Sequence, residues 1–408
     1  MEVVKTVLKI IVGLAVGVLI GLVIGGGIGL LLKGGTPSEF ISKLLDIDLL
    51  EGAGVILAGI AGFIVSLFLL VILHEGGHLV CGLLSGYRFV SFRVFNLTLM
   101  RDADNRLRLK RFSVAGTGGQ CLLSPPDLPL EDIPVTLYNL GGIIANVLAL
   151  IIALPFLWAD LSPLATDLLF IFMITDIFLI LMNGIPMQAG GIGNDAYNIR
   201  LLRREPESKR ALIIQLRSNA MIQNGVRPKD MPHEWFKVPE KIDYRNPLEV
   251  SLPIMEASRL LDMMEWQNAY NRFNALYAHK DEIMPLYVKE IACELAFSAM
   301  ITGRIQQAEN LLDKDLMKYI GAYRKVMTSK ERLLCSIALY IDNDRAKAET
   351  IYKRVLADSP RYLLQGEVKS DLAIMESMLD STPISSAGTE SLPLPIESSA
   401  ASQKQNLP

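Results

Sequence analysis

The sequence has few of the residues that build disulfide frameworks or polyanion-binding surfaces. Its four cysteines include no pair with C-x-x-C spacing, so a disulfide framework is not indicated. Lysine and arginine together number 40 against 43 aspartates and glutamates, for a net charge of −3, which gives no support to a general nucleic-acid-binding role. Histidine is equally scarce, with four in 408 residues. A pair of histidines at a defined spacing is therefore informative.

Apolar residues are abundant instead, at 51% of the chain. Four apolar runs are long enough to cross ~30 Å of hydrocarbon, which takes ~20 helical residues. They cover about 6–32, 52–84, 138–158 and 163–185. The first run is longer than a signal peptide's apolar core and no A-x-A-like cleavage site follows it, so we expect a retained helix. The sequence predicts an all-α polytopic membrane protein with about four transmembrane helices.

Glycines recur every fourth residue in the first run, at Gly13, Gly17, Gly21, Gly25 and Gly29. On a helix this period places them on one face, where another backbone can approach closely. Two interpretations stay open: a seam between copies in an oligomer, or packing of this helix into its own bundle.

Basic residues indicate the orientation. Segment 85–113 carries seven lysines and arginines against two aspartates, and segment 199–210 carries five basic residues, whereas segment 34–50 has one lysine. Because basic loops stay on the cytoplasmic side, we predict that both termini are cytoplasmic and that the second run passes from outside to inside. The short loops favour the plasma membrane of a bacterium.

The second run holds titratable residues that are costly in lipid: His74, Glu75 and His78. Histidines four apart share one face of a helix, so both imidazoles can hold one metal ion. Glu75, one step further round, can take a proton from a water and pass it to a leaving amine. This is the H-E-x-x-H pattern of zinc peptidases. The alternative is a hydrogen-bonded pair of core histidines.

A catalytic zinc site needs a third protein ligand. His233 and His279 lie in the polar C-terminal half and are poor candidates. Two carboxylates remain: Asp195, which follows the fourth apolar run, and Asp176, which lies within it. Asp176 has two further interpretations, as support for a metal ligand or as a hydrogen-bond partner of a neighbouring helix.

The segment "HEGGH" on an apolar helix, followed by "NGIP" and a later aspartate, resembles the site-2 protease family of intramembrane zinc metalloproteases. The resemblance covers about residues 51–200. It implies a helix break at Asn183 and Pro186, and it implies that Asp195 is the third ligand. The chain departs from the family pattern in a longer spacer, residues 187–194, and in having Ala196 where the family has glycine.

"YNLGGIIANV" is similar to the family's glycine-rich third core helix, with Asn146 at the family's asparagine. The resemblance implies a catalytic role for Asn146, whose amide would hydrogen-bond the scissile carbonyl or its developing oxyanion. The alternative is an interhelical hydrogen bond.

Residues 90–115 alternate apolar and polar side chains around "DADN", which predicts a small cytoplasmic β-hairpin. An exposed strand edge there could hold an unwound substrate segment by main-chain pairing. Alternatively, the basic hairpin lies against anionic lipid headgroups.

The C-terminal half is polar. We predict an N-terminal helix and external loop over 1–50, a membrane-embedded core over 51–200, a linker over 201–250, a helical domain over 251–379 and a disordered tail over 380–408. Three segments align on Ala269, Ala308 and Ala348, at offsets of 39 and 40 residues. The last resembles a tetratricopeptide repeat, which predicts divergent helical repeats that bind a partner protein. An ordinary helical domain is the alternative.

Together these patterns predict an intramembrane zinc endopeptidase that cleaves transmembrane segments of other proteins. Its predicted zinc ligands are His74, His78 and Asp195, and its predicted catalytic residues are Glu75 and Asn146. The alternative is a catalytically inactive membrane scaffold whose helical domain recruits partners.

The basic-residue pattern makes a testable prediction about topology. A reporter fused after residue 210 is expected to be cytoplasmic and one inserted near residue 40 to be external, because positively charged loops resist translocation. Paired alkaline phosphatase and green fluorescent protein fusions measure this. The reverse pattern would place the metal motif near the outer side of the membrane.

Overall fold

The computed structural model describes residues 27, 34–45, 49–101, 106–111, 118–189 and 192–380. The expected first membrane helix, apart from Gly27, lies outside these residues, and so do all the glycines of its predicted face. The predicted tail does too, from residue 381 onward.

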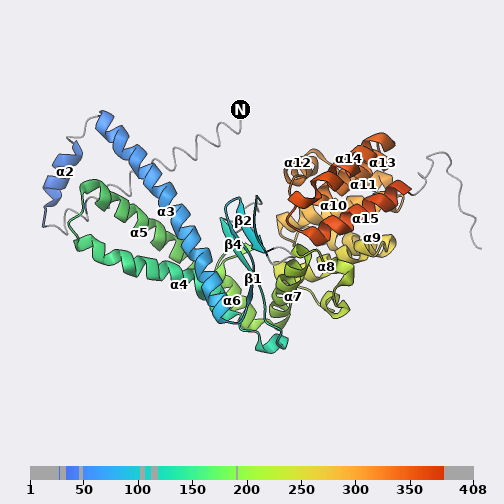
Figure 1. Cartoon of the computed structure of the whole chain (residues 1–408), viewed down its shortest axis with the longest axis horizontal. Helices are drawn as coiled ribbons and strands as arrows, with labels where there is room; N and C mark the ends of the chain where they lie inside the picture. The colour runs from blue at the N-terminus through green and yellow to red at the C-terminus, as the bar shows by residue number, and fades with distance from the viewer. Residues whose placement is uncertain are drawn as a thin grey trace, which may run out of the picture.

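Within the described residues, three helices are long and apolar enough to cross a membrane: α3 (Leu49–Leu84), α4 (Thr136–Ala153) and α5 (Pro163–Gly184). Large apolar side chains such as Leu57 and Ile152 are each 67% exposed on them. An exposed apolar surface of this kind is consistent with contact with a membrane. The helices form one arm of the molecule (Figure 1).

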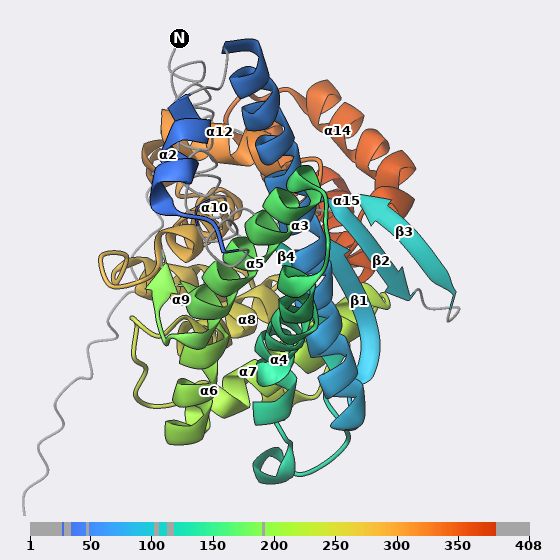
Figure 2. The same cartoon turned by 90° about the vertical axis from the view of Figure 1, so that its left-hand side faces the viewer.

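Glycines set how closely these helices pack. A Cβ added to Gly77 on α3 would lie 2.1 Å from the carbonyl oxygen of Gly141 on α4. A Cβ at Gly141 would in turn lie 2.3 Å from the oxygen of Gly77. The two backbones therefore meet directly, which is how helices pack where lipid supplies no hydrophobic driving force. In Figure 2, α4 and α5 lie in front of α3, with the strands beside it.

A small antiparallel sheet follows α3. Its strands are β1 (Arg88–Val94), β2 (Leu97–Arg101), β3 (Leu107–Arg111) and β4 (Gly119–Ser124), in the order β3-β2-β1-β4. The predicted hairpin corresponds to β2 and β3, which pair Leu99 with Leu109. It is half of a larger sheet, because β1 pairs with both β2 and β4. The sheet lies between the membrane arm and the C-terminal helices (Figure 1).

The remaining elements of the described chain are helices, apart from a two-stranded hairpin within residues 188–193. Beyond the short helix α2 (Pro37–Leu45), the elements are α6 (Asp195–Arg204), α7 (Pro206–Gln223), α8 (Pro247–Asp262), α9 (Trp266–Tyr277), α10 (Pro285–Ile301), α11 (Ile305–Leu311), α12 (Lys314–Tyr323), α13 (Thr328–Tyr340), α14 (Arg345–Asp358) and α15 (Gln365–Asp380). Short 3-10 turns occur at Leu130–Asp132, Leu154–Trp158, Pro228–Asp230, His233–Phe236 and Ser359–Arg361.

The range 201–250 is not a linker throughout, contrary to the sequence prediction. Helix α7 occupies much of its first half and buries Ile213 and Leu216. Both side chains share a hydrophobic core with Leu122 and Leu123 of β4. The apolar residues of "ALIIQL" drive this packing. Helix α7 is thus a rigid bridge between the sheet and the C-terminal helices.

The three aligned alanines are all buried in the same core. Ala269 on α9, Ala308 on α11 and Ala348 on α14 are each 0% exposed within one large core. Small buried residues of this kind allow paired helices to approach closely. Whether the pairs are divergent tetratricopeptide repeats stays a prediction.

Candidate metal centre

Helix α3 carries the histidine motif on one face within its apolar span. His74 and His78 precede the end of the helix at Leu84 by ten and six residues, or about 15 and 9 Å at 1.5 Å per residue. The pair therefore lies inside the predicted hydrocarbon layer but close to one boundary. Because the residues are four apart, both imidazoles project toward the same neighbour, α4.

Helix α5 ends where the sequence predicts. Its last residue is Gly184, between Asn183 and Pro186. The amide of Asn183 donates to the carbonyl oxygen of Leu179 within the same helix. Asn183 thus contributes to the helix end and has no contact with the histidines in the described structure.

The long spacer after α5 is accommodated by a small antiparallel hairpin. Strand β5 (Gln188–Ala189) pairs with β6 (Ile192–Gly193). The hairpin brings the chain back toward the end of α5, since the backbone N–H of Asn194 donates to the carbonyl oxygen of Met187. The additional residues therefore do not carry Asp195 away from the histidines.

Asn194 fixes the position of Asp195. Its side-chain amide donates to the carbonyl oxygens of Met182 and Ile185 at the end of α5, both at 2.6 Å. Its side-chain oxygen accepts from the backbone N–H of Tyr197 at 2.9 Å. Asn194 is thus the N-cap of α6 and ties that helix to α5. Asp195, the first residue of α6, is held beside the motif as a result.

His74, His78 and Asp195 converge on one point. The Nε2 atoms of the two histidines are 3.3 Å apart. The Asp195 Oδ2 atom lies 3.2 Å from His74 Nε2 and 3.3 Å from His78 Nε2. The three side chains form a group that could hold a metal ion.

The Nδ1 atoms of both imidazoles, which point away from Asp195, are hydrogen-bonded, and these hydrogen bonds define the tautomers. His78 Nδ1 lies 2.8 Å from the carbonyl oxygen of Tyr138, which can only accept, so Nδ1 carries the hydrogen. His74 Nδ1 lies 2.7 Å from Asn146 Oδ1. The amide of Asn146 is oriented by its other end, since Nδ2 donates to Asp176 Oδ1 at 2.7 Å. In the neutral imidazoles both Nε2 lone pairs therefore face Asp195.

Three electron-pair donors then meet without a proton between them, a repulsive arrangement that a cation relieves. The edges of the triangle, 3.2 to 3.3 Å, fit four-coordinate geometry. Tetrahedral bonds of 2.0–2.1 Å give about 3.3 Å between ligands. Asp195 Oδ2 is buried and forms no hydrogen bond. The donor set therefore suits a small cation with one position left open.

The charge state of Asp195 suits a ligand. Burial by itself would raise the pKa of its carboxyl group, but the contacts with His74 and His78 outweigh burial and lower that pKa to about 2. Asp195 is therefore a carboxylate at neutral pH.

Glu75 lies between the histidines and the sheet. Its side chain is 8% exposed, and it is within electrostatic reach of His74, His78 and Asp195. A Cβ added to Gly119, the first residue of β4, would lie 2.3 Å from Glu75 Oε1. Only glycine leaves room for the carboxylate at the start of β4.

Arg93 of β1 stabilises this corner of the sheet. Its guanidinium is 2% exposed and donates to the carbonyl oxygens of Phe95 at 2.9 Å and Gly119 at 3.1 Å. Burial lowers the pKa of Arg93, and the charge of Glu75 opposes that shift. Arg93 thus places a positive charge near Glu75, the predicted base. Its hydrogen bond to Gly119 also holds the start of β4, which contacts Glu75.

Asn146 makes the interhelical hydrogen bonds that were the alternative to its implied catalytic role. Its side chain is 0% exposed, and it bridges His74 and Asp176. An amide held at both ends in the protein interior orients the imidazole, and the catalytic role implied by the resemblance stays a prediction. Asp176, the second candidate ligand, is also 0% exposed and is linked to the site by its hydrogen bond with Asn146. Asp176, Asn146 and His74 therefore form one polar chain across α5, α4 and α3.

Several contributors were not found from the sequence. A Cβ at Gly142 on α4 would lie 2.4 Å from His74 Cε1 and 2.6 Å from His78 Nε2, so the imidazoles occupy the space beside it. The glycine pair in the "YNLGG" segment could have indicated this close contact between α4 and the histidines. The Tyr138 carbonyl could not be identified from sequence, since every residue has one. Asn194 could have been found as an N-cap preceding Asp195.

His233 and His279 lie outside the site, as expected, and His279 pairs with Glu282.

Comparisons with protein-family models, with curated proteins and with solved structures give no match for this chain.

The packing at Gly142 generates a prediction. We expect Gly142→Ala to lose most of its bound metal, because the new methyl group occupies the position of the imidazoles. Gly76→Ala is the matched control, since a Cβ there meets nothing within 4 Å and alanine is the better helix former. The test is the metal content of each variant after purification in zinc-containing buffer, measured by mass spectrometry. Full metal content in Gly142→Ala would contradict the geometry.

The two carboxylates generate a second prediction. Asp195→Ala removes a ligand and is expected to abolish stoichiometric metal binding. Asp176→Asn still offers an oxygen to Asn146, so the effect passes through the orientation of His74 and should be at most about tenfold in affinity. Competition with a chelating dye measures both affinities. If Asp176→Asn alone removed the metal, the roles of the two aspartates would be reversed.

Proposed function

We propose that this protein is a zinc-dependent endopeptidase that cleaves transmembrane segments of other membrane proteins. The observation that carries the proposal is the meeting of His74, His78 and Asp195 beside Glu75, within a helix apolar enough to span a membrane. Two imidazoles, one carboxylate and an open position are the donor set of catalytic zinc sites. The resemblance to site-2 proteases over residues 51–200 points to the same reaction.

In this proposal Glu75 handles the proton. Zinc, when bound, would polarise the scissile carbonyl and make water more acidic. Glu75 would take a proton from the attacking water and later deliver it to the leaving amine. Its contact with Gly119 supports this role, because a carboxylate packed against a strand is held in one orientation. Asn146 would act as a positioning residue, by keeping the His74 ring in place.

The sheet supplies a proposed docking site for substrate. A transmembrane helix hides its peptide bonds in its own hydrogen bonds and must unwind before cleavage. Strand β4 is at one end of the strand order, and its first residue contacts Glu75. Pairing of the unwound segment with an edge strand satisfies its backbone groups. Pairing along β4 would also deliver a peptide bond close to Glu75.

The C-terminal helices are proposed to bind a protein partner. Their core is separate from the core that joins α7 to the sheet. Tethering a substrate's cytoplasmic part there would raise its effective concentration at the site to ~mM for a short linker. The alternative function, an inactive scaffold, requires the same partner binding but no metal or cleavage.

The function is tested by Glu75→Gln. We expect this variant to retain about one zinc per chain and to lose cleavage of a helix-destabilised transmembrane substrate in proteoliposomes by at least a thousandfold. The reason is that glutamine cannot accept the proton. Mass spectrometry of the products and metal analysis on the same samples provide the readout.

Glu131→Gln is the matched control, since Glu131 is exposed in the turn before α4. It is expected to cleave at the wild-type rate. Wild-type cleavage by Glu75→Gln would eliminate Glu75 as the base. Stoichiometric zinc without cleavage by the wild-type chain on any transmembrane substrate would favour the scaffold.

A further inference from the structure

A second polar site lies in the C-terminal helices, away from the metal ligands. A cavity of about 410 Å³ is bounded by α7, α8, α10, α13 and α15, and none of the metal-site residues lines it. Its volume is within the usual range for ligand sites. Both apolar side chains, such as Met255, and ionised groups line it.

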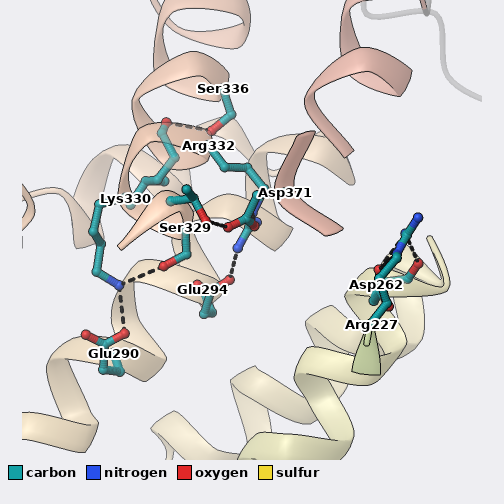
Figure 3. A network of polar contacts seen from close by, with 11 residues as sticks. Arg227, Asp262, Glu290, Glu294, Ser329, Lys330, Arg332, Ser336 and Asp371 are labelled. Carbon is teal, nitrogen blue, oxygen red and sulfur yellow. Dashed lines mark hydrogen bonds and ion pairs between the residues drawn. The ribbon is translucent and has the colours of Figure 1, made fainter. Parts of the chain in front are cut away.

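A preformed ion-pair network makes up one wall. Lys330 Nζ donates to Glu290 at 2.7 Å. Arg332 donates through Nη2 to Glu294 and through Nε to Asp371, both at 2.6 Å (Figure 3). Lys330 is 0% exposed and Arg332 is 3% exposed. Buried charges are costly unless paired, so this network fixes the shape of the wall.

Two buried polar groups of the cavity have no partner. Arg332 Nη1 forms no hydrogen bond, while the face of its guanidinium stacks 3.9 Å from the ring of Phe297. Ser218 Oγ on α7 is also without a partner, and Ser218 is 1% exposed. An unsatisfied buried polar group is unfavourable, because it has lost its hydrogen bonds to water without replacement. Both residues line the cavity, so a ligand there could satisfy both.

The charges of the cavity do not balance. Glu290, Glu294, Glu367 and Asp371 line it, and the cations paired with three of them are Lys330 and Arg332, so four carboxyl groups face two cations. The Glu367 carboxylate forms no ion pair or hydrogen bond with the described residues. Burial, with the nearby charges of Asp371 and Glu290, raises the pKa of Glu367 to about 8. A cation bound beside Glu367 would favour its ionised form.

These features specify the ligand. An anion would satisfy Arg332 Nη1 but would meet the excess negative charge. A bare metal cation would suit Glu367 but would leave Nη1 and Ser218 unsatisfied. A basic amino-acid residue within a peptide carries a cation and, a few bonds away, a carbonyl oxygen that accepts hydrogen bonds.

We propose that this cavity binds a lysine or arginine side chain of a partner peptide, with the cation against Glu367 and a peptide carbonyl oxygen on Arg332 Nη1. Ser218 pairs with a further backbone group of the same peptide. The inference does not depend on the proposed protease activity, because the cavity shares no residue with the metal site.

The test is calorimetric titration of the full chain in nanodiscs with a blocked pentapeptide, acetyl-Ala-Ala-Lys-Ala-Ala-amide. We expect saturable binding. The Nε-acetyl-lysine version, which lacks the cation, should bind at least tenfold more weakly. Free lysine should also bind at least tenfold more weakly, because its carboxylate adds negative charge. Equal binding of the acetylated peptide, or no binding of either, would overturn the proposal. Equal binding of free lysine would reassign the cavity to a free amino acid.

Variants link the binding to the cavity. Glu367→Gln keeps the side-chain volume but cannot ionise beside a bound cation, so affinity for the lysine peptide should fall at least tenfold. Ser218→Ala should weaken binding a few-fold. Glu309→Gln, on the exposed side of α11 and outside the cavity, carries the same charge change and should bind as wild type. Unchanged affinity in Glu367→Gln, or an equal loss in Glu309→Gln, would contradict the site.

Discussion

The convergence of three electron-pair donors on one point is the constraint on which the membrane part of this protein depends. Two imidazole nitrogens and a carboxylate oxygen lie within 3.3 Å of one another. Such an arrangement is unfavourable in an apolar helix bundle unless a cation neutralises it. The surroundings all serve to maintain it. Tyr138 and Asn146 hold the imidazole protons outward, Gly142 leaves space for the rings, and Asn194 fixes the start of α6.

The same interactions hold the bundle together. The polar chain from Asp176 through Asn146 to His74 joins α5, α4 and α3. The direct backbone contact between Gly77 and Gly141 brings α3 and α4 close enough for the chain to form. Interhelical hydrogen bonds and small residues are the main sources of helix association in lipid. The contacts that set the geometry of the site are therefore the same contacts that hold α3, α4 and α5 together. This explains why the polar residues of these helices are concentrated at the site.

Much of this arrangement could be predicted from the sequence, for physical reasons that differ by residue. His74 and His78 were predictable because helical periodicity alone places them together. Asp195 needed the resemblance to a family, because its position depends on a hairpin between α5 and α6. The β2–β3 hairpin was visible as alternation, whereas β1 and β4 depend on pairing between distant segments. The carbonyl of Tyr138 and the space beside Gly142 depend on helix packing, so the one-dimensional pattern did not reveal them. Helix α7 was missed because its apolar residues sit among charged ones, and only its contact with the sheet shows its role.

The coordination of bound metal tests the central claim most directly. X-ray absorption spectroscopy at the zinc edge, on the full chain loaded with one equivalent of zinc, reports ligand type, number and distance. The geometry predicts four light-atom ligands at about 2.0–2.1 Å, with the scattering pattern of two imidazoles. Sulfur ligands, a six-coordinate all-oxygen shell or a single imidazole would contradict the centre formed by His74, His78 and Asp195.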